Sequence, residues 1–154
     1  MGINNTIEWK LAHFNDLSAN ELYNILQLRS AIFVVEQNCV YLDADGKDKQ
    51  CYHLFATQNN VVIACSRIVP PGVSYTEPSI GRIATATAAR GTGKGKELVK
   101  RSIEASLQLH GNTSIKIGAQ LYLKKFYESF GFVQVGNVYD EDGIDHIKMI
   151  RSYA

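Results

Sequence analysis

The sequence predicts a single α/β (α+β) domain in which helices cover a mixed, mostly antiparallel sheet. Its 154 residues are enough for one substantial hydrophobic core, and residues 1–154 contain no internal repeat or domain linker. Short apolar segments with strand character outnumber the helical segments, and a helix of crossover length separates two of the strands. Together these observations predict about seven strands and about four helices.

The first two predicted elements are a strand and a helix. Residues 6–14 alternate apolar and polar side chains with a period of two, as in a half-buried strand. Ser18 and Glu21 then have the spacing of a capping box, in which each side chain satisfies a free N–H group at a helix start. A first helix should therefore run from these residues to about Ser30.

The next segment, 31–41, places Glu36 and Gln37 directly after a run of five apolar residues. A short second helix here would deliver both side chains to a cleft. Residues 42–49 follow as an acidic, turn-like stretch. It lacks the third ligand and the closing glutamate of an EF-hand, so we expect a solvated loop rather than a calcium site.

The middle of the chain contains a predicted hairpin and a fourth strand. Apolar segments at 52–58 and 61–69 are joined by Asn59 and Asn60, and asparagine tolerates the positive φ angles of a tight turn. These segments should form the second and third strands and pair in antiparallel fashion. A proline- and glycine-rich loop follows, and the fourth strand is expected at 80–87.

The second half of the chain begins with a helix and a strand. Residues 96–110 carry apolar side chains on one side and charged ones on the other, which predicts an amphipathic helix. The strand at 114–119 should lie parallel to the fourth strand, because a strand, helix and strand of this length form a crossover unit. The remaining predicted elements are a helix at 121–130 and two closing strands at 132–139 and 144–151.

Composition argues against several classes of function. The formal net charge of +1 gives no basic surplus for holding the phosphates of a nucleic acid. The three cysteines are an odd number without Cys-x-x-Cys pairing, so neither a disulfide framework nor a metal site is expected. No apolar run approaches membrane-spanning length and no signal peptide is recognisable, so we expect a protein of the reducing cytoplasm without a membrane partner.

A glycine-rich turn between the fourth strand and the following helix is the strongest chemical signal. Gly91, Gly93 and Gly95 remove side chains at alternate positions, so backbone N–H groups can converge on a bound anion. The helix adds its own free N–H groups and the positive end of its dipole. A P-loop is excluded because Glu97 stands where a magnesium-binding hydroxyl is required, and the glycine spacing does not fit a Rossmann fingerprint.

Two motifs resemble signatures of the GNAT superfamily of acyl-CoA N-acyltransferases. Arg90, Gly93 and Gly95 fit Arg/Gln-x-x-Gly-x-Gly/Ala, which resembles the pyrophosphate-binding motif of that superfamily. Residues 120–132 resemble its other signature, Asn-x-x-Ala-x-x-x-Tyr-x-x-x-Gly-Phe. This stretch matches at Tyr127, Gly131 and Phe132 and departs at Gln120 and Leu123. Two motifs in the right order and at a fitting separation make the resemblance more specific than either one alone.

Further segments resemble the ElaA-type branch of the same superfamily. They lie at 34–37, 45–48 and 141–147, so the resemblance covers nearly the whole chain. One departure is Val40, which stands where a proline is expected after Cys39.

The resemblance implies a sheet that splays between its fourth and fifth strands, with acetyl-CoA wedged in the opening. It assigns the pantetheine to the backbone of the fourth strand and the pyrophosphate to the glycine-rich turn, where lysine side chains would suit a diphosphate. The cofactor-binding residues expected on this basis are Ile83, Ala84, Thr85, Arg90, Gly91, Thr92, Gly93, Lys94, Gly95, Lys96 and Gln120.

Transfer to an amine requires an acid for the departing thiolate and a base for the acceptor ammonium. The resemblance assigns the acid to Tyr127, because a phenol is a proton donor at neutral pH; the alternative is a purely structural core tyrosine. Glu36 is the first candidate base, since desolvation near the acceptor cleft would raise its pKa. His53 and His146 are alternative bases, and structural histidines or a water chain are the remaining alternatives.

Three further residues are candidates for binding the acceptor. Arg67 and Arg82 lie within predicted strands, where a large charged side chain needs a partner or an open cleft. They would bind an anionic part of the acceptor, or instead form ion pairs with Glu36 or a nearby aspartate. Gln37, which follows Glu36 directly, is the third candidate.

The function expected from these features is that of an acetyl-CoA-dependent N-acetyltransferase. It would move an acetyl group directly to a primary amine of a small molecule or a peptide. The alternative is a non-catalytic acyl-CoA-binding or sensor protein that keeps the phosphate cradle but transfers nothing. Neither nucleic acid nor a membrane is an expected partner, and a homodimer is left open.

Overall fold

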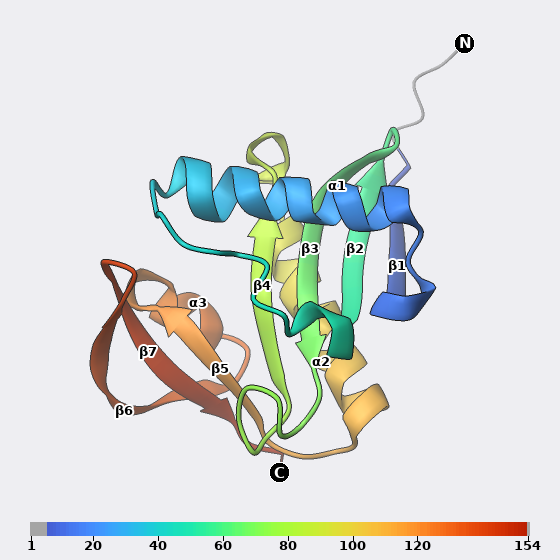
Figure 1. Cartoon of the computed structure of the whole chain (residues 1–154). Helices are drawn as coiled ribbons and strands as arrows, with labels where there is room; N and C mark the ends of the chain where they lie inside the picture. Colours follow the sequence, from blue (N-terminus) through green and yellow to red (C-terminus); the bar gives the residue numbers. More distant parts are fainter. Residues whose placement is uncertain (1–5, 154) are drawn as a thin grey trace.

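The computed structural model describes residues 6–153, and its strands form two sheets (Figure 1). The first sheet is four-stranded in the order β1-β2-β3-β4 and the second is three-stranded in the order β5-β7-β6. All the ladders within the two sheets are antiparallel. The strands are β1 (Glu8–His13), β2 (Tyr52–Gln58), β3 (Val61–Val69), β4 (Ser79–Thr85), β5 (Ile115–Gln120), β6 (Phe132–Glu141) and β7 (Ile144–Arg151).

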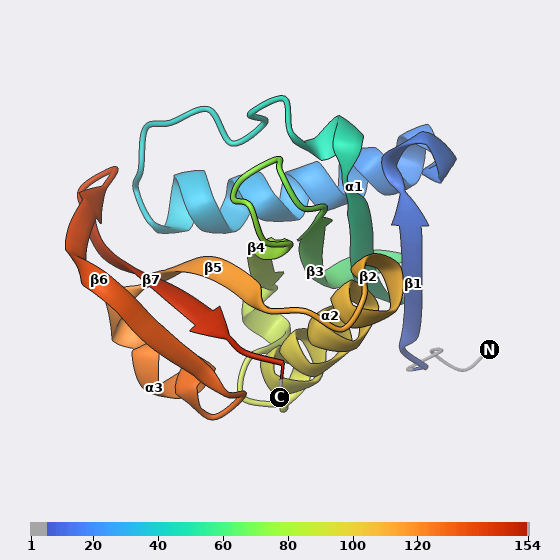
Figure 2. The same ribbon diagram turned by 90° about the horizontal axis from the view of Figure 1, so that it is seen from below.

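Helices cover both faces of the first sheet. α1 (Ala19–Arg29) crosses one face and α2 (Lys94–His110) the other, so that Figure 2 shows the sheet between them. α3 (Lys124–Glu128) packs beside β6 of the second sheet. The shorter helical segments are η1 (Phe14–Asp16), η2 (Ser30–Glu36), η3 (Asp48–Gln50), η4 (Thr87–Ala89) and η5 (Leu121–Leu123).

The predicted fold class, with seven strands and a splay between the fourth and fifth, is confirmed. The capping box forms as expected, because the Ser18 hydroxyl accepts from the Glu21 N–H and the Glu21 carboxylate accepts from the Ser18 N–H. The hairpin between β2 and β3 also forms. Its turn residues, Asn59 and Asn60, have φ values of 53° and 62°.

The segment at 31–41 does not form a separate short helix, contrary to prediction. Instead, η2 continues α1 as a π-helix, with the Gln37 N–H donating to the Ile32 carbonyl five residues earlier at 3.1 Å. The wider turn lets the apolar run keep packing on the sheet while Glu36 and Gln37 reach its end. A π-helical turn of this kind has no distinctive spacing of apolar residues, so helix propensity alone does not predict it.

Two other helices differ from prediction at their starts. α2 begins at Lys94 rather than at residue 96, because Gly93 takes a left-handed conformation at φ 80° and serves as its N-cap. The helix expected at 121–130 begins with the 3₁₀ turn η5 before α3. Residues 6–153 therefore hold three α-helices, and the π-helical η2 takes the place of the fourth predicted helix.

Hydrophobic clusters lie on both faces of the first sheet. The larger cluster lies under α2 and extends to the second sheet, with Leu98 and Ile147 fully buried. The smaller one packs α1 on the opposite face through residues such as Ile25. Neighbouring residues of β2 alternate between them, because Leu54 belongs to the first cluster and Phe55 to the second.

β4 and β5 diverge from a common start. The Lys116 N–H donates to the Pro78 carbonyl at 3.0 Å, which ties the two strands together where both begin. Figure 1 shows them running in the same general direction and then separating. Their facing edges have no ladder within residues 6–153, because β4 pairs with β3 and β5 with β7. The backbone groups of these edges are therefore available to a ligand.

Replacement of Leu98 by alanine should lower the free energy of unfolding by about 2–5 kcal/mol, because it leaves a cavity between α2 and the sheet. Chemical denaturation measures the change. Lys100→Ala, at an exposed position of the same helix, should change it by less than about 0.5 kcal/mol. Equal effects of the two substitutions would contradict the assignment of Leu98 to the core.

Candidate active site

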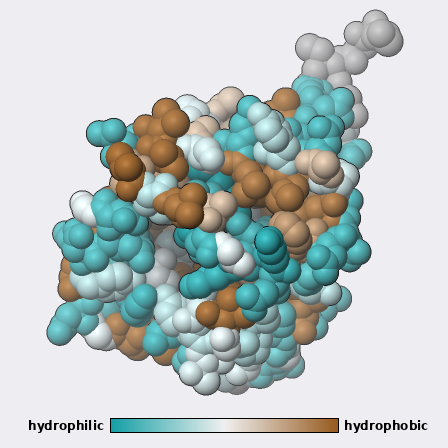
Figure 3. All heavy atoms as spheres, viewed as in Figure 1, coloured by the Kyte–Doolittle hydropathy of each residue, from teal (hydrophilic) through white to brown (hydrophobic). Residues whose placement is uncertain are grey.

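A cleft of about 920 Å³ lies between the two sheets. β4 forms one wall and β5 with β7 the other, and Figure 3 shows the surface hollowed between them. The predicted site residues that line it are Glu36, Gln37, Arg67, Arg82, Ile83, Ala84, Thr85, Arg90, Gly95, Gln120, Tyr127 and His146. The structure therefore gathers residues from across the whole predicted site, although they are far apart in sequence.

The glycine-rich turn lies at one end of the cleft. Gly91 and Gly93 have φ values of 77° and 80°, which a residue with a Cβ atom rarely adopts. No side chain caps the start of α2, so the N–H groups of its first turn lack side-chain partners. Of the turn, Arg90 and Gly95 line the cleft, and the other predicted residues lie outside its lining. Those residues are Gly91, Thr92, Gly93, Lys94 and Lys96.

Glu36 and Arg90 form an ion pair across the mouth of the cleft. Arg90 Nη1 and Nη2 donate to the two Glu36 carboxylate oxygens at 2.5 and 2.7 Å. The hydrogen bonds from Arg90 lower the pKa of Glu36. The predicted rise in the pKa of Glu36 is therefore wrong, because the carboxylate is exposed and paired with a cation instead of desolvated.

A second contact across the cleft joins the two amide side chains. Gln120 Nε2, at the end of β5, donates to Gln37 Oε1, just after η2, at 3.1 Å. Both residues line the cleft. Their contact links the wall formed by the second sheet to the segment that carries Glu36.

Tyr127 lies deep in the cleft, on α3. Its side chain is 6% exposed and contacts the rings of Phe126 and Phe132 at centroid distances of 5.2 and 6.1 Å. Burial raises the pKa of its phenol. Tyr127 is therefore both a core residue and a protonated group at the cleft surface. The structural interpretation and the proton-donor interpretation of this residue are compatible.

The two predicted histidine bases occupy different environments. His146 lines the cleft, with Nδ1 at 2.7 Å from the Ile144 carbonyl and Nε2 at 3.2 Å from a Glu141 carboxylate oxygen. His53 lies outside the cleft lining and is 1% exposed, with Nε2 at 2.9 Å from the Asp48 carbonyl. Burial lowers the pKa of His53. The structure thus brings His146, and not His53, together with Tyr127.

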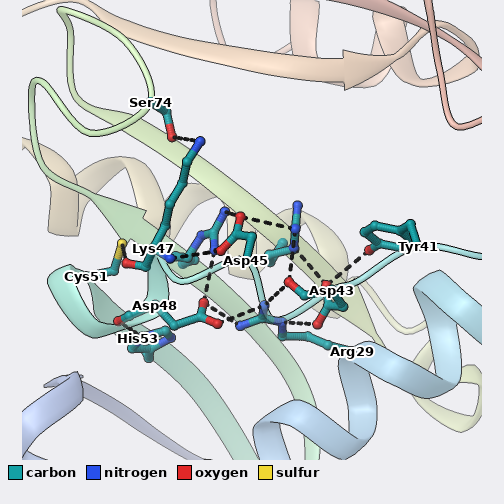
Figure 4. Close-up of polar contacts among 11 residues, drawn as sticks. Arg29, Tyr41, Asp43, Asp45, Lys47, Asp48, Cys51, His53 and Ser74 are labelled. Carbon is teal, nitrogen blue, oxygen red and sulfur yellow. Dashed lines mark hydrogen bonds and ion pairs between the residues drawn. The ribbon is translucent and has the colours of Figure 1, made fainter.

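Arg67 belongs to a buried network of charges below the cleft. Asp48 lies between Arg29 and Arg67, accepting from Nη1 of each at 2.8 and 3.0 Å. Asp45 binds Arg67 from the other side at 2.8 Å, and Asp43 binds Arg29 Nε at 2.9 Å. Figure 4 shows Asp43 and Asp48 on either side of Arg29.

Arg82 joins the same network from a bulge of β4. Its φ of 49° coincides with a register shift between β3 and β4, and this turns its side chain to Asp43 and Asp45. Its guanidinium also lies 5.7 Å from the centre of the Tyr41 ring. Arg67 and Arg82 therefore pair with nearby aspartates, which was the second of the two predicted alternatives.

The network corrects the prediction that residues 42–49 form a solvated loop. Asp43 and Asp48 are only 7% and 6% exposed, because buried arginines neutralise them. Sequence reasoning also missed Arg29, which ends α1 and is 1% exposed. Its position on the apolar side of a predicted helix was the available signal.

Comparison with known proteins identifies the family. A family model described as an acetyltransferase (GNAT) domain matches residues 33–152. The chain belongs to the GNAT family. The match spans the cleft from η2 to β7, and so includes both walls and the glycine-rich turn.

Relatives of this GNAT protein match along almost its whole length. A UPF0039 protein of Synechocystis is 46% identical over 145 residues, 94% of each chain. The protein ElaA of Escherichia coli is 41% identical over 147 residues, 94% of this chain and 96% of that one. The resemblance to the ElaA-type branch is thereby confirmed, and the chain is an ElaA-like member of an acyltransferase family.

Solved structures agree with this placement. The crystal structure of E. coli ElaA has a TM-score of 0.90 at 40% identity, covering 96% of this chain and all of that one. The structure of an acyl-CoA N-acyltransferase from Pseudomonas aeruginosa has a TM-score of 0.92 at 39% identity, with the same coverage.

Residues 6–153 contain neither a membrane-spanning helix nor a cluster of metal-binding side chains. Within that range, no helix is both long and apolar enough to cross a membrane. No group of three or more histidine, cysteine, aspartate or glutamate side chains is arranged there to hold a metal ion.

Asp48→Asn should lower the free energy of unfolding by about 3 kcal/mol, because it leaves Arg29 and Arg67 without a shared buried counter-charge. Denaturant titration monitored by circular dichroism measures this loss. Asp16→Asn, at an exposed position, removes the same charge and should cost less than about 0.5 kcal/mol. A similar small loss for Asp48→Asn would mean that the network does not hold the loop.

The contribution of Asp45 to stability should depend on pH. Burial opposes its ionisation, but the hydrogen bond from Arg67 and the nearby charges outweigh burial and lower its pKa to about 2. A lowered folded-state pKa stabilises the fold above the unfolded value, near pH 4, and this contribution is lost as the pH falls towards 2. The stability difference between wild type and Asp45→Asn should therefore be constant above about pH 5 and shrink below pH 4. A difference that stays constant down to about pH 3 would contradict this account.

Proposed function

We propose that this protein is an acetyl-CoA-dependent N-acetyltransferase that moves an acetyl group directly to a primary amine. The observation that carries the proposal is the opening between β4 and β5, which leads from the glycine-rich turn to Tyr127. Family membership supports acyl transfer. The geometry adds a route along which a donor and an acceptor can meet.

The residues of the cleft fit an acyl-CoA. The exposed edge of β4 at Ile83, Ala84 and Thr85 offers backbone N–H and C=O groups, which suit the amides of pantetheine in the manner of an added strand. The start of α2 and the positive-φ glycines before it suit a pyrophosphate. A side chain at Gly95 would approach Thr85, the last residue of β4, to 3.9 Å, so the turn and the strand lie close together.

Bound acetyl-CoA supplies a thioester whose carbonyl carbon accepts the amine nitrogen and whose sulfur leaves. Tyr127 donates its phenolic proton to that sulfur as the C–S bond breaks. Its raised pKa keeps the proton in place until then, because burial disfavours the phenolate. The aromatic contacts of Tyr127 hold the ring in one orientation.

His146 is the better placed of the candidate bases. Its Nδ1 carries a hydrogen that it donates to the Ile144 carbonyl, so Nε2 is the nitrogen that can accept a proton. The carboxylate of Glu141, 3.2 Å away, stabilises the imidazolium that results. Glu36 is a weaker base while Arg90 holds its carboxylate, because the pairing lowers its pKa.

Incubation with acetyl-CoA and a panel of primary amines tests the proposal. A thiol reagent should report free CoA, and mass spectrometry should find an amine heavier by one acetyl group. A rise in melting temperature with acetyl-CoA measures binding separately. Binding without CoA release from any amine would instead identify an acyl-CoA-binding or sensor protein, and the absence of binding would rule out both.

Tyr127→Phe should lower kcat by about 100-fold or more, because the departing thiolate loses its proton donor. The dissociation constant for acetyl-CoA should change little, since the ring remains in place. Tyr23→Phe removes a hydroxyl from an exposed position on α1 and should leave kcat unchanged. An unchanged kcat in Tyr127→Phe would show that another group supplies the proton.

A further inference from the structure

A cluster of side chains in the cleft has no part in the function proposed so far. Tyr75, Gly118, Tyr139 and Lys148 all line the cleft. Lys148 Nζ donates to the Tyr75 hydroxyl at 2.9 Å and lies 4.7 Å from the centre of the Tyr139 ring. We call these four residues the Lys148 cluster.

Strand pairing places this cluster next to His146. In the β5–β7 ladder, Gly118 faces Lys148 and Gln120 faces His146. Residues two apart on a strand point to the same side, so both pairs face the cleft. The cluster therefore lies two residues along β7 from His146, the proposed base.

Gly118 leaves space between the two phenols. A Cβ atom at this position would stand 3.1 Å from the hydroxyl oxygens of both Tyr75 and Tyr139. The two hydroxyls thus converge above a glycine of β5. Tyr75 is carried there by the loop between β3 and β4, whose last residue, Pro78, bonds to Lys116.

The polar groups of the cluster are incompletely paired. Lys148 has no carboxylate within ion-pair distance among residues 6–153. Over the same range, the buried hydroxyl of Tyr139 has no hydrogen-bond partner. A buried polar group without a partner is costly, so an unpaired hydroxyl beside an ammonium that lacks a negatively charged partner indicates a binding site for an anion.

The arginines of the cleft do not compete for this role. Arg67 and Arg82 are neutralised by Asp43, Asp45 and Asp48, and Arg90 by Glu36. Of the cations that line the cleft, the ones without an ion pair in the described part of the chain are Lys148 and Lys47. Lys47 lies 3.4 Å from the hydroxyl of Ser74, the neighbour of Tyr75, and so adds charge on the same side.

We propose that the acceptor amine also carries a carboxylate, which Lys148 binds together with the hydroxyls of Tyr75 and Tyr139. The acceptor is then an amino acid or a similar small amino carboxylate. This inference rests on the proposed acetyltransferase function and names its class of substrate. The carboxylate of the acceptor serves as the counter-ion that Lys148 lacks. The amine of the acceptor lies towards His146, two residues along β7.

The charge of the cleft favours a carboxylate over a phosphate. Glu141 and Asp142 also line it, and they repel a dianion more strongly than a monoanion. Lys148 itself remains an ammonium. Burial alone would lower its pKa, but its hydrogen bond to Tyr75 and the electrostatic effect of the nearby Tyr139 phenol outweigh burial and raise the pKa. It therefore binds an anion and does not act as a base.

The experiment compares L-amino acids with their carboxamides as acceptors, using acetyl-CoA and detection of free CoA. The two members of each pair differ in the negative charge of the carboxylate but little in size. The amino acid should have a kcat/KM about 10- to 100-fold higher, as expected for a hydrogen-bonded charge. O-phosphoethanolamine and phenethylamine serve as a phosphate-bearing and an uncharged amine.

Lys148→Met should raise KM for the amino acid about 10- to 100-fold and abolish the preference over the carboxamide. The KM for acetyl-CoA and the kcat/KM for the carboxamide should not change, which separates lost recognition from damaged folding. Tyr139→Phe, a smaller change, should reduce the preference several-fold. Lys100→Met, at an exposed position of α2, is the matched control and should behave like wild type.

Three results would overturn the inference while the proposed function stands. The first is that the wild type uses amino acids and carboxamides equally well. The second is a higher kcat/KM for O-phosphoethanolamine than for amino acids. The third is that Lys148→Met loses activity equally towards the amino acid and its carboxamide. CoA release from no amine at all would instead overturn the proposed function, and the inference with it.

Discussion

The divergence of β4 and β5 is the constraint on which the rest of the structure depends. The hydrogen bond between Lys116 and Pro78 closes the sheets at one end, and beyond it each strand pairs only on its outer side in the part of the chain described here. Such an opening exposes polar backbone, which is costly unless water or a ligand satisfies it. The larger hydrophobic cluster joins the two walls under α2, because it includes Ile80 of β4 and Ile117 of β5, and the smaller cluster packs α1 on the first sheet.

Opposite charges stabilise the cleft from below and across its mouth. Two aspartates in the loop before η3, Asp43 and Asp45, and Asp48 at its start are held by arginines of α1, β3 and β4, which are Arg29, Arg67 and Arg82. A loop without regular structure is thereby fixed against three elements at once. Because these arginines are already neutralised, the positive charges left for a ligand in the described part of the cleft are those of Lys47 and Lys148.

The fold could be predicted from the sequence in detail because its signals are local. The capping box at Ser18, the asparagine turn and the alternation in β1 each depend on neighbouring residues, and all are confirmed. Of the residues that the two motifs singled out, Arg90, Gly95 and Tyr127 line the cleft, and their roles there stay predictions. Charge partners could not be predicted, since Glu36 meets Arg90 from 54 positions away and Asp48 meets Arg29 from 19. The cluster at Lys148 has no sequence motif, because its four members come from four separate segments: the loop between β3 and β4, β5, β6 and β7.

The antiparallel register of β5 and β7 has a consequence for how this protein can vary. His146 and Lys148 face the cleft while Ile147 and Met149 are fully buried between and beside them. Insertion or deletion of one residue within β7 would exchange the two sets, placing charge in the core and aliphatic side chains in the opening. Changes in length are therefore confined to the connecting turns. Under the proposed function, point substitution at alternate positions of these two strands would change acceptor preference without disturbing the core.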